Sequence, residues 1–153
     1  MSEYKVAVIM GSPNDRPKME PAAETLAAFG ITADVQVMSA HRSPAKVAEF
    51  VGSARANGYA AIIAAAGMAA HLAGAAAAHT TLPVIGVPLS GGALNGVDAL
   101  YSTVQMPRGI PVATVAVDGA VNAALLAVQI LAVTDESLVA ALADDRAARA
   151  AAT

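Results

Sequence analysis

Short apolar runs alternate along the chain with segments of helical composition. Each run is rich in valine, isoleucine or alanine and is followed by a loop with glycine, serine or proline, and then by a helical stretch. The runs lie at Val6–Met10, Ala33–Val37, Ala60–Ala64, Pro83–Val87 and Val112–Val117. This alternation predicts a parallel sheet. Because the runs are largely apolar, we expect helices on both faces, giving a three-layer α/β/α fold of the α/β class with a five-stranded parallel sheet.

Residues that favour helix ends support this division. Ser43 followed by Pro44 suits the N-cap and first position of a helix, and Asn95 is a candidate cap for a helix over Val97–Gln105. No internal repeat or linker interrupts the chain, so we expect residues 1–153 to form one domain.

Two further helices are predicted at the end of the chain. They lie near Val121–Ala132 and Glu136–Ala151, and Thr134 with Asp135 forms a plausible cap pair between them. Leu138 and Leu142, four residues apart, would lie on one face of the last helix. This helix could pack on its own sheet or reach a neighbouring subunit.

Composition narrows the class of protein. The hydrophobic residues make up 56% of the chain and the charged residues 14%, which excludes a disordered protein. The net charge is −3 and the 9 lysines and arginines are scattered, so we expect no binding to nucleic acid. With no cysteine, the chain has neither disulfides nor thiolate metal sites, and the cytoplasm is the expected location.

The long uncharged stretch over residues 56–97 does not predict a membrane span. It is dominated by alanine and is interrupted by several glycines and prolines, whereas a spanning helix needs about 20 strongly apolar residues. Aromatic residues make up only 3% of the chain, and the helices are apolar on more than one face. Such a monomer would expose large apolar patches, so we expect a homo-oligomer.

Three loops carry the candidate chemistry. They follow the first, second and third predicted strands, at Gly11–Asp15, Ser39–Pro44 and Gly67–Gly74. The carboxyl ends of parallel strands meet at one edge of the sheet, where ligands of open α/β folds bind. Each loop combines small residues with polar groups and opens a helix whose amides attract anions. We therefore expect a phosphorylated small molecule as the ligand.

Several common sites are not supported. The first loop lacks the glycine and lysine spacing of a P-loop and the three-glycine pattern of a dinucleotide site. The chain has no His-Glu-x-x-His motif and no clustered carboxylates, so we expect no metal. It also lacks the Gly-x-Ser-x-Gly motif of serine hydrolases.

Each candidate residue also has a purely structural interpretation. Ser12, Asn14 and Asp15 could only satisfy turn and cap amides, although a functional Asp15 would accept hydrogen bonds from sugar hydroxyls. An arbitrary histidine is more often structural than catalytic, but His41 stands beside Arg42 at a strand end, which pairs a proton carrier with a cation that grips phosphate or carboxylate.

The sequence does not decide the roles of the other two histidines and of two further loops. His71, near a helix start, could be a partly buried residue bonded to a carbonyl, and His79 could be a cation stabilised at a helix C-terminus. Gly91-Gly92 and the Met106–Gly109 segment have the composition of mobile loops, which could cover a site or simply connect elements.

At these residues the sequence resembles the 5-(carboxyamino)imidazole ribonucleotide mutase family of purine biosynthesis. The resemblance extends over nearly the whole chain through MGSPND, SAHRSP, GMAAHLAG, LPVIGVP, NGVDALYSTVQMPRGIPVATV and NAALLAVQIL, in the family's order and spacing. It implies a flavodoxin-like fold, an octamer and a reaction without a cofactor. In that reaction a carboxylate moves from the exocyclic nitrogen to carbon 4 of the aminoimidazole ring, through release and recapture of carbon dioxide.

The resemblance also implies roles for the residues of the three loops. His41 is the expected proton shuttle, Asp15 contacts the ribose and Arg42 lies near the phosphate of the ribonucleotide substrate. His71, the second expected catalytic residue, would enclose the carboxylate or carbon dioxide together with the Gly67–Leu72 loop. The other expected substrate contacts are Ser12, Asn14, Ser39, Gly67, Ala70 and Leu72.

The chain departs from the family's usual residues at four positions. Asn14 stands where serine is usual, and Met68, Ala65 and Ala73 stand where glycine, glycine and proline are usual. If the backbone at Met68 requires a positive φ, the methionine is strained.

Two alternatives to the mutase are left by these residues. The carboxylase branch of the family uses free carbon dioxide, but tends to carry lysine at the position of Arg42 and to lack the histidine at position 71. A non-catalytic module that binds a phosphoribosyl group or a nucleotide on the same scaffold is the other, because fold alone does not dictate chemistry.

Overall fold

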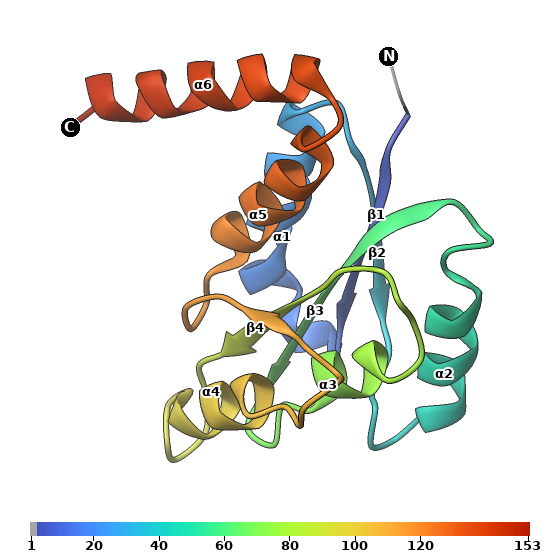
Figure 1. The fold of residues 1–153 in the computed structure, drawn as a ribbon. Coiled ribbons are helices and arrows are strands. Elements are labelled where there is room, and N and C mark those ends of the chain that lie inside the picture. The colour runs from blue at the N-terminus through green and yellow to red at the C-terminus, as the bar shows by residue number, and fades with distance from the viewer. Residues whose placement is uncertain (1–2) are drawn as a thin grey trace.

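A five-stranded parallel sheet forms the centre of the structure, a computed structural model that describes residues 3–153 (Figure 1). The strand order is β2-β1-β3-β4-β5. The strands are β1 (Lys5–Met10), β2 (Thr32–Val37), β3 (Tyr59–Gly67), β4 (Val84–Leu89) and β5 (Ala113–Thr114). All neighbouring strands are parallel, so the predicted α/β class and five-stranded parallel sheet are confirmed. That residues 1–153 form one domain stays a prediction.

Helices cover both faces of this sheet. A short 3-10 turn and six α-helices follow the strands: η1 (Pro13–Asp15), α1 (Arg16–Ala28), α2 (Pro44–Ser53), α3 (Leu72–Ala77), α4 (Val97–Val104), α5 (Ala120–Ala132) and α6 (Glu136–Ala151). The helices α1 and α5 share a core with one face, and α2 and α3 share a core with the other. The predicted three-layer α/β/α architecture is therefore confirmed.

The two cores follow from the alternation of side chains along each strand. On β1, Val6, Val8 and Met10 point to the face of α1 and α5, while Ala7 and Ile9 point to the face of α2 and α3. All five side chains are fully buried. Apolar residues at every position are what a central strand needs when both of its faces are covered.

The topology places the loops after β1 and β3 at one point of the sheet. From β1 the chain passes to β2 on one side, and then returns across β1 to form β3 on the other side. This is the flavodoxin-like strand order, in which the carboxyl ends of β1 and β3 flank the switch point where ligands bind.

The last strand is shorter than predicted. Only Ala113 and Thr114 pair regularly with β4, whereas the sequence predicts a strand over Val112–Val117. Beyond Thr114 the chain still bonds to β4, from Val115 N to Gly86 O and from Asp118 N to Pro88 O. The step from Val115 to Asp118 is three residues, whereas the matching step on β4, from Gly86 to Pro88, is two. The extra residue forms a bulge that interrupts the regular pairing of the two strands.

The predicted caps have mixed outcomes. Asn95 does not cap α4; it adopts φ 48°, and Gly96 takes the N-cap position with φ 96°. The reason is close packing, because a side chain at Gly96 would collide with Val117 and approach the backbone of Ser90. Ser43 does precede α2 with Pro44 in the first turn, but its hydroxyl donates to Ser39 O and caps no amide of α2.

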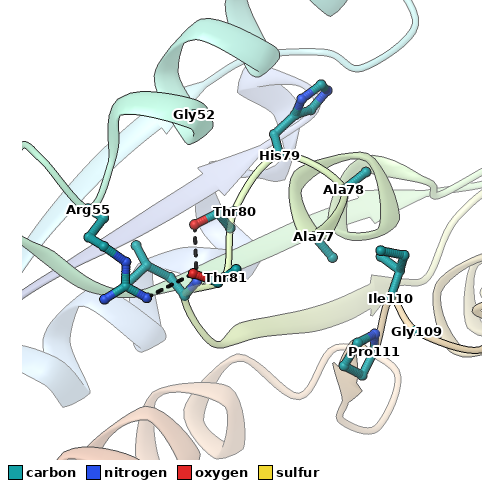
Figure 2. Close-up of a pocket in the computed structure, with 11 residues that line it drawn as sticks. Gly52, Arg55, Ala77, Ala78, His79, Thr80, Thr81, Gly109, Ile110 and Pro111 are labelled. Atoms are coloured by element: carbon teal, nitrogen blue, oxygen red, sulfur yellow. Dashed lines mark hydrogen bonds between the residues drawn. The ribbon is translucent and has the colours of Figure 1, made fainter.

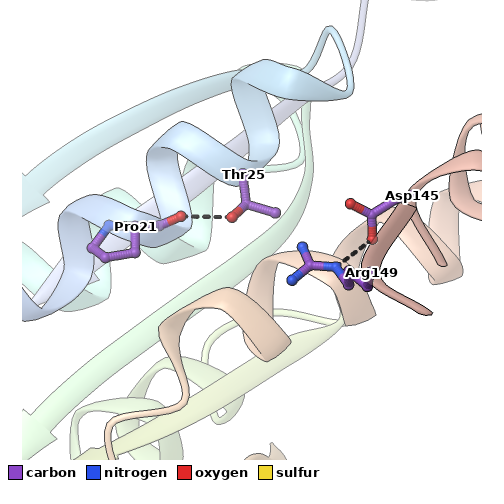
Figure 3. A network of polar contacts seen from close by, with 4 residues as sticks. All are labelled: Pro21, Thr25, Asp145 and Arg149. Atoms are coloured by element: carbon purple, nitrogen blue, oxygen red, sulfur yellow. Dashed lines mark hydrogen bonds and ion pairs between the residues drawn. The ribbon is translucent and has the colours of Figure 1, made fainter. Parts of the chain in front are cut away.

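The terminal helix α6 has the predicted bounds, and Asp135 caps its N-terminus by accepting a hydrogen bond from Ser137 N at 3.0 Å. Leu138 is buried against the core of α1 and α5, and Leu142 packs beside it, so the start of the helix docks on its own subunit. Its far end extends away from the sheet (Figure 1). In that exposed half Arg149 pairs with Asp145 at 2.7 Å, as Figure 3 shows beside the Thr25–Pro21 bond of α1.

None of the helices within residues 3–153 has the length and apolar character needed to cross a membrane.

Candidate active site

A cavity of about 510 Å³ lies at the carboxyl ends of β1, β2, β3 and β4. Its volume is in the range of sites for small organic ligands. The predicted residues that line it are Ser12, Asn14, Asp15, Ser39, His41, Arg42, Gly67, His71 and Leu72. The three loops predicted from the sequence to carry the chemistry therefore converge on one cavity. Ala70 is not among its lining residues, because its side chain is 1% exposed and faces the core.

In the loop after β1, the Ser12 side chain bonds within the loop, whereas the Asp15 side chain caps no helix amide. The Ser12 hydroxyl accepts a hydrogen bond from Asn14 N at 3.2 Å, as its structural interpretation predicts. Asp15 stands at the N-cap position of α1, yet its carboxylate makes no capping bond. Burial raises the pKa of Asp15, and the hydrogen bond from the Ser12 backbone and the charge of Lys18 only partly oppose this. The half-buried Asp15 carboxylate can therefore accept hydrogen bonds from a ligand.

Serine side chains fix the loop after β2. The Ser39 hydroxyl accepts a bond from Arg42 N at 3.1 Å, and the Ser43 hydroxyl bonds to both Ser39 N and Ser39 O. These bonds close the loop on itself and leave the His41 and Arg42 side chains outside it. Within residues 3–153 neither the His41 ring nor the Arg42 guanidinium has a hydrogen-bonding partner. Both groups are thus available to a bound molecule.

The loop after β3 contains a strained residue. Met68 adopts φ 53°, which side chains other than glycine rarely do, and its own side chain is 60% exposed. Two tight turns follow, from Ala70 N to Met68 O and from His71 N to Ala69 O. The usual glycine of the family at this position is explained by the positive φ, and the strain expected for methionine is confirmed.

His71 is placed by two neighbouring helices. Its Nδ1 lies 3.5 Å from Ser102 O of α4, which agrees with the interpretation of this histidine as a residue bonded to a carbonyl. The ring also lies against Gly74 of α3, where a β-carbon would overlap it. Because the residue is nevertheless exposed and lines the cavity, a structural contact and a role at the site are compatible.

A fourth loop, whose role the sequence left undecided, also lines the cavity. Ser90, Gly91 and Gly92, which follow β4, line the cavity as well. From the sequence, the glycine pair could either cover a site or simply connect elements, and the structure places it at the cavity. Its position at a strand's carboxyl end was the available signal, the same one that identified the other three loops.

A larger hollow of about 700 Å³ lies elsewhere and contains none of the predicted site residues. It is lined by His79, Arg55 and Thr81 among others, and the Arg55 guanidinium donates to the Thr81 hydroxyl at 3.1 Å (Figure 2). The C-terminal ends of α2 and α3 flank it, so the cations there face the negative ends of helix dipoles. This supports the structural interpretation of His79.

Within residues 3–153, no three histidine, aspartate or glutamate side chains are grouped so that they could hold a metal ion. The arrangement at the smaller cavity instead combines a carboxylate, a guanidinium and two imidazoles. These groups can bind sugar hydroxyls and a phosphate and can transfer a proton.

Comparison with known proteins gives a consistent family. The AIR carboxylase family model matches residues 5–152. The chain is 54% identical to the N5-carboxyaminoimidazole ribonucleotide mutase of Brucella melitensis, over 94% of this chain and 90% of that protein. It is equally similar to the Escherichia coli K12 protein of the same name, at 54% identity over 95% of this chain and 87% of that protein.

Two further matches extend the comparison. The chain is 53% identical to part of the phosphoribosylaminoimidazole carboxylase of Saccharomyces cerevisiae, over 86% of this chain and 23% of that longer protein. The solved structure of Treponema denticola PurE superposes with a TM-score of 0.88 at 28% identity, covering 97% of this chain and 92% of that one. By its sequence over almost its full length and by its fold, the chain belongs to the AIR carboxylase family.

Proposed function

We propose that this chain is a mutase of de novo purine biosynthesis that converts 5-(carboxyamino)imidazole ribonucleotide to 4-carboxy-5-aminoimidazole ribonucleotide. The convergence of Asp15, His41 and His71 on one cavity is the observation that carries the proposal. The 54% identity to two proteins named as this mutase supports the same assignment. The reaction is an isomerisation, so it requires no external oxidant, reductant or group donor.

The substrate is held by the loops after β1 and β2. The Arg42 guanidinium, which has no other partner within residues 3–153, binds the phosphate, and the Asp15 carboxylate accepts hydrogen bonds from the ribose hydroxyls. Ser12, Asn14 and Ser39 provide further polar contacts from the same wall of the cavity. The amide of Asn14 takes the place of the hydroxyl that is usual in the family.

The carboxylate moves in two steps. The bond between the exocyclic nitrogen and the carboxylate breaks, its electron pair stays on nitrogen, and carbon dioxide is formed. Carbon 4 of the ring then attacks carbon dioxide and makes the new carbon–carbon bond. His41 removes the proton of carbon 4 and returns a proton to the nitrogen, so atoms and charge balance. Proton transfer by one positioned side chain contributes about 100- to 10,000-fold to such a rate.

Carbon dioxide must stay in the cavity between the two steps. His71 and the Gly67–Leu72 loop surround the position of the carboxylate, and the small residues there let the walls approach closely. Confinement keeps carbon dioxide near carbon 4 and so raises its effective concentration. Ala70 contributes through the backbone of this loop, since its side chain points into the core.

The carboxylase named for the yeast relative is the second candidate. It would use aminoimidazole ribonucleotide and free carbon dioxide, and the 53% identity to part of that protein favours it. Purified protein incubated with each substrate separates the two. We expect product from the carboxyamino compound without added bicarbonate, and little from aminoimidazole ribonucleotide with bicarbonate. The reverse preference assigns the carboxylase, and binding without product from either assigns a non-catalytic module.

We also propose that the protein works in the cytoplasm as a homo-oligomer. The resemblance to the mutase family implies that this oligomer is an octamer. Leu94, Val97, Tyr101 and Val104 form an apolar stripe along and just before α4, and Tyr101 is 63% exposed. Covering this stripe with a second copy would remove its apolar surface from water. Light scattering on the purified chain tests this, and a monomeric mass would contradict it.

A further inference from the structure

Ser90 is held by two charged side chains that lie outside the cavity. The Ser90 amide donates to Asp118 Oδ1 at 2.9 Å, and its hydroxyl donates to the other oxygen of the same carboxylate. The Lys18 ammonium, from α1, donates to both the carbonyl and the hydroxyl of Ser90. One residue of the β4–α4 loop is thereby tied to the start of α1 and to the loop before α5.

Asp118, which anchors Ser90, has a strained backbone conformation. Asp118 adopts φ 59°, and in this conformation its amide bonds to Pro88 O at 2.8 Å, two residues before Ser90. A residue other than glycine in this region is disfavoured and persists only where the surroundings fix it. Burial alone would raise the pKa of Asp118, but the bonds from Ser90 and the Lys18 charge outweigh it and lower the pKa.

The segment that follows Ser90 has little to hold it otherwise. Gly91 and Gly92 have no side chains, and both have positive φ, 146° and 65°. They line the cavity, and the Met68 side chain lies against Gly92, 3.3 Å from where a β-carbon of Gly92 would be. The position of this glycine wall is therefore set by the residue before it.

We propose that Lys18 and Asp118 are positioning residues that hold Ser90 and so fix the Gly91–Gly92 wall in place beside the cavity, which limits the escape of carbon dioxide. This inference rests on the proposed mutase function. Neither side chain lines the cavity, so both act through Ser90 and not on the substrate.

The test measures how much of the carboxylate that leaves nitrogen is recaptured. Wild-type protein and variants are given substrate labelled with carbon-13 in the carboxylate, in buffer with excess unlabelled bicarbonate. The labelled fraction is then measured in the ring-carboxylated product alone. A merely structural loss of active protein lowers the amount of product but not this fraction.

The variants are chosen to keep the fold. Asp118→Gly removes the carboxylate and relieves the positive φ at once, and Lys18→Met removes the ammonium from an exposed side chain. Lys18→Arg keeps a cationic donor. The matched control is Asp135→Gly, because Asp135 makes the same bonds to the amide and hydroxyl of Ser137 but lies at the start of α6.

We expect wild-type protein and Asp135→Gly to retain the label. Asp118→Gly and Lys18→Met should raise the ratio of unlabelled to labelled product by at least about 10-fold, the population change expected on loss of one charged hydrogen bond. Lys18→Arg should restore most of the retention. Unchanged labelling in both disrupted variants overturns the proposal.

Hydrogen exchange separates this inference from the proposed function. The Ser90 amide should exchange faster in Asp118→Gly than in wild type, and slow exchange there refutes the anchoring whether or not the enzyme turns over. If wild-type protein yields no ring-carboxylated product at all, the proposed function fails, and the role in retaining carbon dioxide fails with it even where exchange confirms the anchoring.

Discussion

The chemistry of the cavity depends on a few side chains that their own loops leave free. The sequence indicated these residues because polar groups followed three strands at their carboxyl ends, and the structure brings His41, Arg42, Asp15 and His71 to one cavity. Lys18 and Asp118 could not be found in this way. They meet at Ser90, which is 72 positions from Lys18 and 28 from Asp118, and no local pattern encodes such a contact.

His41 carries the proton in the proposed reaction. His41→Asn should lower kcat by about 100- to 10,000-fold and change substrate affinity little, because it removes a proton carrier and no substrate anchor. Steady-state rates and equilibrium binding measure the two effects separately. His79→Asn, at the distant hollow, is the matched control and should leave both unchanged. A near-wild-type kcat for His41→Asn would exclude the assigned role.

Arg42 should act on binding instead. Arg42→Ala removes the proposed phosphate contact and should weaken binding by about 1.5–3 kcal/mol, the range for a lost hydrogen bond to a charged group. Calorimetric titration with the ribonucleotide measures this change. Arg55→Ala, whose guanidinium bonds to Thr81, is expected to bind normally. If Arg42→Ala and wild-type protein bind the ribonucleotide with equal affinity, Arg42 does not contact the phosphate.

Asp15 should lower the stability of the free protein. Since burial raises its pKa in the folded state, the folded state binds the proton more tightly than the unfolded state does. Its favourable contribution is present below the ordinary pKa of 3.8 and is lost as the pH rises through the higher folded value. Asp15→Asn should therefore raise the free energy of unfolding at pH 7, with the gain shrinking towards pH 3, while it weakens ligand binding. Urea denaturation across this range is the measurement, and lower stability at pH 7 would contradict the pKa argument.

At the level of elements, central strands were easier to predict than edges and turns. The central strands β1, β3 and β4 contain or overlap their predicted runs because burial on both faces requires apolar residues at nearly every position, and the edge strand β2 contains its predicted run although Asp34 and Gln36 interrupt it. The edge strand β5 was predicted too long, since the valines of residues 115–117 suit a strand while the bulge beside β4 ends it. The cap at Asn95 failed because packing of Gly96 against Val117, and not local capping, determines that turn.

The β3–α3 loop makes its own prediction about stability. Met68→Gly should relieve the positive φ and raise the free energy of unfolding by up to about 1 kcal/mol, after the greater chain entropy of glycine is subtracted. This corresponds to a rise in Tm of about 2–4 °C for a chain of this size. Met68→Ala removes the same side chain without relieving the backbone. Equal Tm values for the two variants would show that φ at this position carries no cost.

At the scale of the whole molecule, the order β2-β1-β3-β4-β5 turns distant residues into one site. Asp15, His41 and His71 belong to three different βα loops, and parallel strands bring the three loops to the same edge. The pattern of the sequence predicted this edge, whereas the volume of the cavity and the glycine wall after β4 required coordinates. The two features together form part of the enclosure that a reaction through carbon dioxide requires.

The central claim is that this enclosure moves a carboxylate from nitrogen to carbon without external carbon dioxide. Carbon-13 NMR of the carboxyamino substrate, labelled in its carboxylate and mixed with the wild-type protein in bicarbonate-free buffer, tests it directly. The account predicts that the carbamate resonance is replaced by the resonance of a ring carboxylate. Label that appears only as free carbon dioxide and bicarbonate, at the rate seen without protein, would contradict it.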